Sequence, residues 1–315
     1  MRAFLEAGYP VRTFSTDPSE KGAFPSGVDE RIGDIRDTFA LDEACRGRDL
    51  VIHMAALLHV TRPPFPPRKE YADINVGGTT AVVRAALQNN VSRIVFFSTI
   101  AVYGKSDGRL LDEDSPSHPD SFYAETKLEA EKLVLAAKTQ DGRPLGTVLR
   151  LAAVYGPRVK GNYLRLVTAL ARRRFVPIGG GMNRRTLIYE SDVATAALIA
   201  ARHSAADGKI YNVTDGRCHS MNDIIGAICE ALGRKPPRWR LPLRPVRSAA
   251  GMLENLAHAL GVQSPAGRAT IEKYTEDLAV SGKRITTELG FAPQFNLAGG
   301  WLDTIRYMKQ SGAIS

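Results

Sequence analysis

The sequence is poor in cysteine and contains no long apolar run. Its 315 residues include three cysteines, Cys45, Cys218 and Cys229. This odd number, at no metal-binding spacing, argues against a disulfide scaffold. No stretch reaches the roughly 18 apolar residues of a membrane-spanning helix, and the first residues lack the apolar run of a signal peptide. We therefore expect a protein of the reducing cytoplasm, with neither a membrane partner nor a metal site.

Basic residues outnumber acidic ones by 42 to 33, which raises the question of nucleic-acid binding. The main arginine clusters, at 172–174, 184–185 and 238–247, are separated by apolar runs. They form no single long basic face with interleaved aromatic residues, which nucleic-acid binding favours. We expect no nucleic-acid partner, and assign some of these arginines to a small anionic ligand and the others to solvent.

The richest chemical pattern lies between residues 94 and 127. An apolar strand ends at Ser98-Thr99, and further on a helix opens near Tyr123, which shares one helix face with Lys127. If that face meets the strand end, a hydroxyl, a phenol and an ammonium converge. Such a site suits proton transfer at a substrate alcohol, coupled to hydride transfer to a nicotinamide. The ammonium would lower the pKa of the phenol, and Thr99 would orient the substrate hydroxyl. A Tyr-x-x-x-Lys pair can also occur by chance, so its catalytic interpretation depends on the motifs around it.

Strands and helices alternate over residues 1–155, which predicts an α/β fold with a parallel sheet. The expected strands lie near 11–15, 49–54, 93–98 and 146–151, and the expected helices near 37–46, 76–89 and 121–139. Residues 156–315 form a second lobe, with 186–215 returning to the sheet. In this lobe we expect helices over 162–172 and 248–260, and residues 301–309 close the chain.

Seven short motifs follow one another in a fixed order along most of the chain. They are Gly33-Asp34-Ile35-Arg36-Asp37, His53-Met54-Ala55-Ala56, Asn75 with Gly78-Thr79, Ser98-Thr99 with Val102-Tyr103-Gly104, Tyr123 with Lys127, Leu149-Arg150 with Val154-Tyr155-Gly156-Pro157, and Arg185 with Ile188-Tyr189 and Asp192-Val193. In this order the chain resembles the extended short-chain dehydrogenase/reductase family, in its NAD-dependent nucleotide-sugar epimerase, reductase and dehydratase branch. The resemblance implies a Rossmann-like, doubly wound parallel sheet with a smaller C-terminal substrate lobe.

The resemblance also implies roles for individual residues. Thr99, Tyr123 and Lys127 would be catalytic. Cofactor contacts would come from Asp34, Ile35, Met54, Ala55, Ala56, Asn75 and Ser98, together with Tyr123 and Lys127. Asn162 and Arg185, with Thr99, would hold a nucleotide-diphosphate sugar, because a guanidinium bonds phosphate bidentately. The cofactor would be NAD; the uncharged Ser15 does not repel a 2′-phosphate, so NADP stays open. Three of these residues can also be explained without a function. Asp34 could be a carboxylate in a turn, Ile35 an aliphatic residue of the core, and Arg185 a charge on the surface.

One piece of the family pattern is missing. No strand followed by a Gly-rich turn precedes the residues that end at Ala7-Gly8, which read as the last turns of a helix. We expect the natural protein to begin roughly 20–25 residues earlier, because a pyrophosphate site needs strand, turn and helix together. The alternative is that another segment replaces the strand. Loss of this central strand would leave its two neighbours unpaired.

The two residues after Thr99 reduce the number of reactions that this site could catalyse. In family members that act as 4,6-dehydratases an Asp-Glu pair follows the catalytic Thr, whereas Ile100-Ala101 stands here and can transfer no proton. This favours 4-epimerisation, or reduction and oxidation, at C4 of the sugar. The stretches 159–162 and 179–185 and the pair His59-Val60 resemble 4-reductases or epimerases of UDP-N-acetylhexosamines. A hydroxysteroid or flavonol-type reductase, a 4,6-dehydratase-like protein and a non-catalytic dinucleotide-binding pseudoenzyme stay open as alternatives.

The resemblance further implies a homodimer. In the family, the helix after Asn75 and the helix that carries Tyr123 pack against their copies in a second subunit. The apolar seam would consist of Val82, Ala85, Ala86, Leu128, Leu135 and Ala136. A plainer reading is that half of these residues face the sheet.

Overall fold

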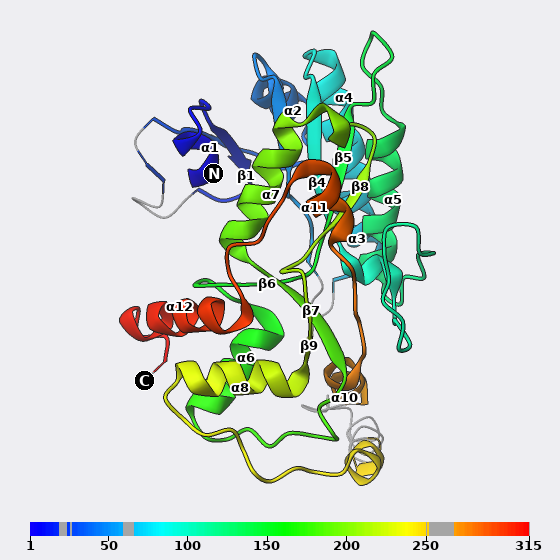
Figure 1. Cartoon of the computed structure of the whole chain (residues 1–315). Helices are drawn as coiled ribbons and strands as arrows, with labels where there is room; N and C mark the ends of the chain where they lie inside the picture. The colour runs from blue at the N-terminus through cyan, green and yellow to red at the C-terminus, as the bar shows by residue number, and fades with distance from the viewer. Residues whose placement is uncertain (19–23, 26, 59–65, 250, 252–267, 315) are drawn as a thin grey trace.

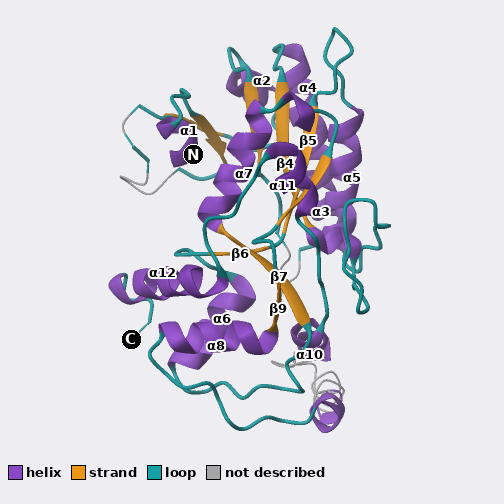
Figure 2. Cartoon of the chain, in the orientation of Figure 1, coloured by secondary structure: helices purple, strands orange, loops and turns teal. Residues whose placement is uncertain are grey.

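The computed structural model describes residues 1–18, 24–25, 27–58, 66–249, 251 and 268–314. The pair His59-Val60 and most of the helix expected over 248–260 lie outside these residues. The chain forms two lobes, with the larger sheet in the upper one in Figures 1 and 2.

The larger sheet has four parallel strands in the order β3-β4-β5-β8. They are β3 (Leu50–His53), β4 (Arg93–Thr99), β5 (Gly146–Leu151) and β8 (Ile210–Val213). A second parallel pair, β1 (Arg12–Ser15) and β2 (Asp29–Ile32), forms a separate sheet. β1 and β3 thus belong to different sheets. Among the described residues of the first lobe, no Gly-rich turn joins a strand to a helix.

Helices cover both faces of the larger sheet, because successive side chains of a strand point to opposite faces. Ile94 and Phe96 of β4 pack in a core with α2 (Thr38–Cys45), α4 (Gly78–Gln88) and α5 (Phe122–Ala136). Val95, between them, packs in a second core with α1 (Arg2–Glu6), α7 (Glu190–Arg202) and α11 (Lys283–Leu289). Two short helices, α3 (Arg68–Tyr71) and η1 (Ala72–Gly77), lead into α4, while η2 (Ile100–Tyr103) follows β4 and η3 (Ser204–Ala206) follows α7. The parallel sheet predicted from the alternating pattern, and its doubly wound form implied by the family resemblance, are confirmed.

The second lobe has its own small sheet and its own core. In the sheet, β7 (Arg184–Tyr189) pairs with β6 (Ala153–Tyr155) and with β9 (Cys218–Ser220). Around it lie α6 (Gly161–Ala171), α8 (Met221–Ala231), α10 (Arg268–Thr275) and α12 (Leu297–Gln310). The core centres on Trp301, whose ring stacks on Tyr155 with 4.7 Å between centroids. The boundary expected near residue 155 stays a prediction.

Two features differ from the simplest reading of the sequence. Within residues 186–215, β8 joins the larger sheet, but β7 joins the small one. Residues 278–291 pack back into the core of the first lobe, so the chain crosses between lobes more than once. The sequence did not predict β2, in which three of the four residues are polar and give no apolar signal.

The apolar residues of α4 that were expected to form a subunit contact lie inside the same chain instead. Val82, Ala85 and Ala86 are buried in the core between α4 and the larger sheet, so the prediction that they point outward is wrong. These positions form the i, i+3, i+4 stripe with which a helix covers a sheet. On α5, Leu128 and Leu135 are half-buried against the same chain, and Ala136 is exposed.

Candidate functional site

The carboxyl end of β4 and the first turns of α5 hold the candidate catalytic residues. Thr99 ends β4, and its Oγ1 accepts the Ala101 N–H at 3.2 Å, which caps the short helix η2. Tyr123 lies in the first turn of α5, where the Ser121 hydroxyl caps the helix. α5 packs against both β4 and η2, and the Lys127 ammonium lies over the ring of Phe96 on β4, so the helix of the Tyr-x-x-x-Lys pair lies against the strand that ends at Thr99.

The Tyr123 phenol is in its protonated form at neutral pH. Burial, and then the neighbouring Tyr71 phenol, raise its pKa to about 12. The sequence predicts the opposite direction, through the field of Lys127. The prediction is wrong because burial disfavours the charged phenolate more strongly. In this state Tyr123 is a proton donor.

Lys127 is a buried amine at the edge of its titration range. Its side chain is 2% exposed, and its Nζ lies 3.9 Å from the centroid of the Phe96 ring. Burial lowers its pKa to about 7, although the Glu131 carboxylate acts in the other direction. Near pH 7 the residue therefore exists in both charged and neutral forms, which is typical of functional sites.

Behind Lys127 lies a buried ion pair that the sequence did not point to. Glu131, one helical turn beyond Lys127, accepts two hydrogen bonds from Arg150 on β5, at 2.7 Å from Nη2 and 3.0 Å from Nε. It also accepts the Ser98 hydroxyl at 2.5 Å. Arg150 in turn lies over the Tyr103 ring, 4.7 Å from its centroid. The i+4 spacing from Lys127 was the available signal, since it places Glu131 on the same helix face.

His53, which packs against the same Phe96 ring as Lys127, is held neutral. Its Nε2 lies 2.9 Å from the Thr79 hydroxyl, which donates its own proton to the Asn75 carbonyl at 2.6 Å. The imidazole must therefore be the donor to Thr79, with its proton on Nε2. Burial, and then the charge of Lys127, lower the His53 pKa to about 3. A second positive charge beside Lys127 is thus avoided.

The predicted cofactor residues occupy two kinds of environment. Met54 and Ala55 are exposed at the carboxyl end of β3, and Ala56 is half-buried. Asp34 is bound by Arg36, whose Nη2 lies 2.5 Å away, and this contact lowers the Asp34 pKa to about 2. Ile35 is a core residue that packs tightly against Gly78, where an added Cβ would lie 2.8 Å from it.

Two further predicted residues use their side chains to hold the framework. Asn75 accepts the Leu57 N–H at 2.7 Å and donates to the Thr126 hydroxyl at 3.0 Å. It thereby ties the loop after β3 to the helix that carries Tyr123. Ser98 donates to the Glu131 carboxylate and is therefore part of the ion-pair network behind Lys127.

The predicted substrate residues lie in the second lobe. Asn162 is exposed at the start of α6. Arg185 on β7 bonds Glu276, with 2.8 Å between Nη1 and Oε2, and also donates to the Lys273 carbonyl. Burial raises the pKa of Tyr163, the neighbour of Asn162, and the charge of Arg185 acts in the opposite direction. Arg185 is thus a half-buried, paired arginine, and Glu276 is a residue that the sequence did not single out.

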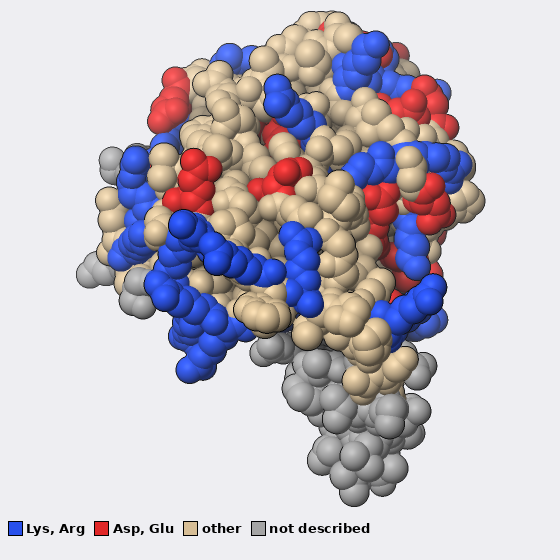
Figure 3. Space-filling view, turned by 60° about the horizontal axis from the view of Figure 1, so that its bottom comes forward, with Lys and Arg blue, Asp and Glu red and all other residues tan. Residues whose placement is uncertain are grey.

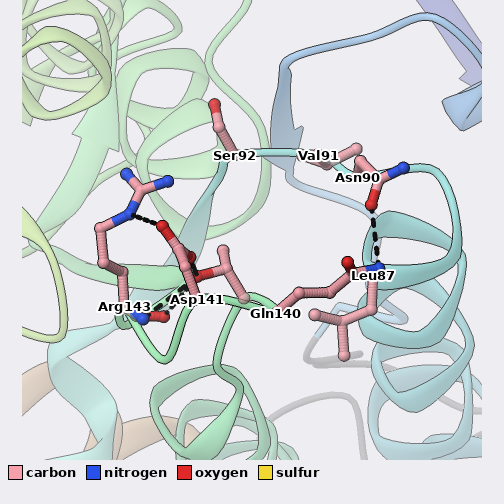
Figure 4. A pocket seen from close by; sticks show the side chains of 8 residues that line it. Leu87, Asn90, Val91, Ser92, Gln140, Asp141 and Arg143 are labelled. Carbon is pink, nitrogen blue, oxygen red and sulfur yellow. Dashed lines mark hydrogen bonds and ion pairs between the residues drawn. The ribbon is translucent and has the colours of Figure 1, made fainter.

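Two hollows of the described surface are lined by residues other than the candidate catalytic ones. One of about 190 Å³ lies between the end of α4, the start of β4 and the loop around Arg143 (Figure 4). In it, Gln140 donates to Asn90 at 3.1 Å, and Arg143 bonds Asp141. This is the amino end of β4, whereas ligands of open α/β sheets bind at the carboxyl ends. We assign no function to this hollow.

Within the described part of the chain, no group of three or more His, Cys, Asp or Glu side chains could hold a metal ion. In the same residues, no helix is both long and apolar enough to cross a membrane.

Comparisons with known proteins agree with this architecture. An undecaprenol-linked sugar epimerase of Escherichia coli O157:H7, N-acetyl-alpha-D-glucosaminyl-diphospho-ditrans,octacis-undecaprenol 4-epimerase, is 29% identical over 88% of this chain and 82% of its own length. A dTDP-glucose 4,6-dehydratase of Streptomyces griseus is 30% identical over 83% of this chain and 72% of its own. The structure of MoeE5 in complex with UDP-glucuronic acid and NAD superimposes with a TM-score of 0.76 at 25% identity, over 98% of this chain and 94% of that one.

The sequence model of the NAD dependent epimerase/dehydratase family matches residues 1–214. This range includes the whole of the larger sheet and the three candidate catalytic residues. The chain therefore belongs to the NAD-dependent epimerase/dehydratase family.

Proposed function

We propose that the chain is an NAD-dependent 4-epimerase or 4-reductase that acts on the C4 hydroxyl or keto group of a sugar diphosphate, with a nucleotide-diphosphate sugar as substrate. The observation that carries the proposal is that α5, the helix of Tyr123 and Lys127, packs against β4, which ends at Thr99. A sugar hydroxyl held there would have an orienting hydroxyl, a proton donor and a cation around it.

The residues at this edge fit a dinucleotide. Met54 is exposed at the carboxyl end of β3 although it is apolar, and such surface favours a flat, partly apolar ligand. The ammonium of Lys127 contacts an aromatic ring, and its N–H groups would donate to acceptors such as ribose hydroxyls. NAD, when bound, supplies the hydride acceptor and donor. Tyr123, Lys127, Asn75 and the segment after β3 would hold its nicotinamide end, and Asp34 and Ile35 its adenosine end.

The proton chemistry belongs to Tyr123. With a pKa of about 12, its phenol is ready to donate a proton to the C4 oxygen when a keto group is reduced. In the opposite direction it must accept the proton of the C4 hydroxyl, and Lys127 in its charged form would stabilise the phenolate. Thr99 would hold the C4 oxygen in line with the phenol, an orienting role.

Asn162 and Arg185 would bind the diphosphate. The E. coli relative and MoeE5 support this substrate class, because both are named with a sugar joined to a diphosphate. They differ in the group at the other end of the diphosphate, which is a polyprenol in the first and a nucleoside in the second. Elimination of water is disfavoured, since Ile100 and Ala101 after Thr99 can transfer no proton.

A carbonyl reductase of an apolar substrate is the second candidate. It is favoured by the contact between Arg185 and Glu276, which already neutralises the guanidinium intended for the diphosphate. The two candidates differ in ligand binding: only the first requires a diphosphate.

The test is turnover of a panel of UDP-hexoses and UDP-N-acetylhexosamines with NAD, with the products separated by chromatography. We expect Tyr123→Phe to lower kcat by roughly 10²–10⁴-fold, the usual contribution of general acid–base catalysis, while the sugar still binds. Tyr307→Phe, which removes an exposed phenol of α12, is the matched control. A Tyr123→Phe enzyme of undiminished rate contradicts the assignment. Turnover of apolar ketones, without binding of any diphosphate sugar, favours the second candidate.

We also propose a cytoplasmic homodimer that uses the exposed sides of α4 and α5. The three cysteines are free thiols, which fits a reducing compartment. Light scattering that gives the mass of a single chain at micromolar concentration would exclude a stable dimer.

A further inference from the structure

Two loops of the second lobe that are distant in the sequence run side by side. The Gly179 N–H donates to the Leu241 carbonyl at 2.8 Å, and the Leu241 N–H donates to the Pro177 carbonyl at 2.9 Å. Arg240 adds a bond to the Gly180 carbonyl at 2.7 Å. At the other end, Arg234 donates to the last carbonyls of α6. We call residues 172–182 and 233–247 together the basic loop surface; residues 243–247 of the second segment are helical.

This surface holds the net charge of the protein. Its two segments contain nine Lys and Arg residues and no Asp or Glu, which leaves 33 residues of each sign in the rest of the chain. The formal charge of +9 is therefore concentrated here. Figure 3, which brings the lower end of the molecule forward, shows Lys and Arg side chains gathered on one side of that end. Six exposed members form no ion pair with any described residue: Arg172, Arg173, Arg174, Lys235, Arg238 and Arg244.

Apolar side chains stand exposed between these charges. Trp239 is 85% exposed and Met182 is 72% exposed. Val176 and Leu241, in the paired part of the two loops, are also exposed. A tryptophan with aliphatic neighbours inside a cationic field combines the two features of a membrane-interface contact.

We propose that the basic loop surface binds the surface of an anionic lipid bilayer, with Trp239 inserted at the level of the headgroups. Each Lys or Arg near such a surface strengthens binding about fivefold, and the exposed apolar groups enter the boundary between headgroups and acyl chains. This revises the expectation of no membrane partner, which rested on the absence of a spanning segment. A peripheral contact requires no spanning helix.

The aliphatic groups argue against a nucleic acid as the partner. Single-stranded nucleic acids bind where several aromatic side chains stack on successive bases. Here one exposed aromatic side chain stands among Met182, Val176 and Leu241, which have no face for stacking.

The surface also lies close to the proposed diphosphate site. The Phe175 ring, directly after the Arg172–Arg174 run, packs on Tyr274 with 6.0 Å between centroids. Arg185 donates to the carbonyl of the same Tyr274 at 3.5 Å. A sugar diphosphate held in a bilayer would thus be presented near Arg185; this step rests on the proposed function, whereas the membrane contact itself does not.

The chain contains its own reporter for this contact. It has two tryptophans, and Trp301 is fully buried in the second core, so changes of emission on binding come from Trp239. We expect vesicles of phosphatidylglycerol and phosphatidylcholine to shift the emission to shorter wavelength and to protect it from acrylamide, and vesicles of phosphatidylcholine alone to do neither. The effect should fall with added salt. Trp239→Phe should remove the optical signal while co-sedimentation with anionic vesicles persists.

The charge contribution is measured with matched variants. Replacing Arg172, Arg173 and Arg174 by Gln should lower the partition coefficient on the order of 100-fold, from about fivefold per charge. A control triple variant, Lys105→Gln with Lys132→Gln and Lys138→Gln, removes the same charge from exposed positions of the first lobe and should bind nearly as well as the wild type. Equal losses in the two variants would overturn the proposal, as would a blue shift caused by a single-stranded oligonucleotide but not by anionic vesicles. No turnover is needed, so the result is independent of the proposed reaction.

Discussion

His53 makes the folded protein sensitive to acid, and the size of the effect follows from its burial. An imidazole in the unfolded chain takes up a proton below about pH 6.5. In the folded protein burial and Lys127 lower the His53 pKa to about 3. Between these values the unfolded state binds one proton more than the folded state. Stability is therefore fully present above about pH 6.5 and is lost progressively as the pH falls toward 3.

The magnitude is about 1.4 kcal/mol for each pH unit within this window. At about pH 5 the solution is roughly 1.5 units below the pKa of His53 in the unfolded chain. Protonation of His53 in the unfolded state should therefore lower the free energy of unfolding by about 2 kcal/mol. His53→Gln removes the titrating group and keeps an N–H that can donate to Thr79. The variant can be less stable overall, but it should lose about 2 kcal/mol less than the wild type between pH 7 and pH 5.

The assay is urea unfolding followed by circular dichroism at the two pH values. His118→Gln, which changes an exposed histidine, is the control and should follow the wild type. If the wild type and His53→Gln lose the same free energy between the two pH values, the imidazole is not held neutral beside Lys127 and the reasoning fails.

Three further predictions concern charged groups around the site. Glu131→Ala should destabilise the fold by roughly 3–5 kcal/mol, because it leaves the buried Arg150 without its partner; a urea midpoint close to that of the wild type would contradict the role of this pair. The rate should fall as the pH rises through about 7, the pKa of Lys127, because the ammonium loses its charge. The Lys127→Arg variant stays charged and should not show this fall. If its rate falls over the same pH range, Lys127 is not the group that causes the fall. Glu276→Gln should free the Arg185 guanidinium and lower the Kd of UDP-sugars in calorimetry, whereas an increased Kd would show that Glu276 holds Arg185 in its binding position.

The fold was predictable where burial is continuous. β4 and β5 are buried on both faces, so their apolar runs show in the sequence without reference to any partner. β2 gave no such signal, because three of its four residues are polar. The sequence also showed the apolar stripe of α4, but it did not show what this stripe packs against. The stripe covers the larger sheet of the same chain, and a helical period alone does not distinguish a core face from a subunit contact.

The site was predictable where it depends on local spacing. Tyr123 and Lys127 share a face because helical residues four apart always do, and the same spacing extends to Glu131. Glu276 has no such relation to Arg185, from which it is separated by 91 positions. The protonation states were also beyond the sequence, since the Tyr123 pKa is raised by burial and by Tyr71. Burial is a property of packing, and the sign of a pKa shift depends on it.

The basic loop surface could not be predicted from the sequence either, because it depends on which segments are neighbours in the fold. In the sequence, the arginines at 172–174 and 238–247 are separate clusters divided by apolar runs, and on that ground a continuous basic face was rejected. In the fold, the backbone pairing of Leu241 with Pro177 and Gly179 brings the two clusters together. Net charge is fixed by composition, but its local density depends on which loops are neighbours. Because electrostatic attraction to a bilayer decays within a Debye length, it is this local density, rather than the formal charge of the chain, that decides whether the protein binds a membrane.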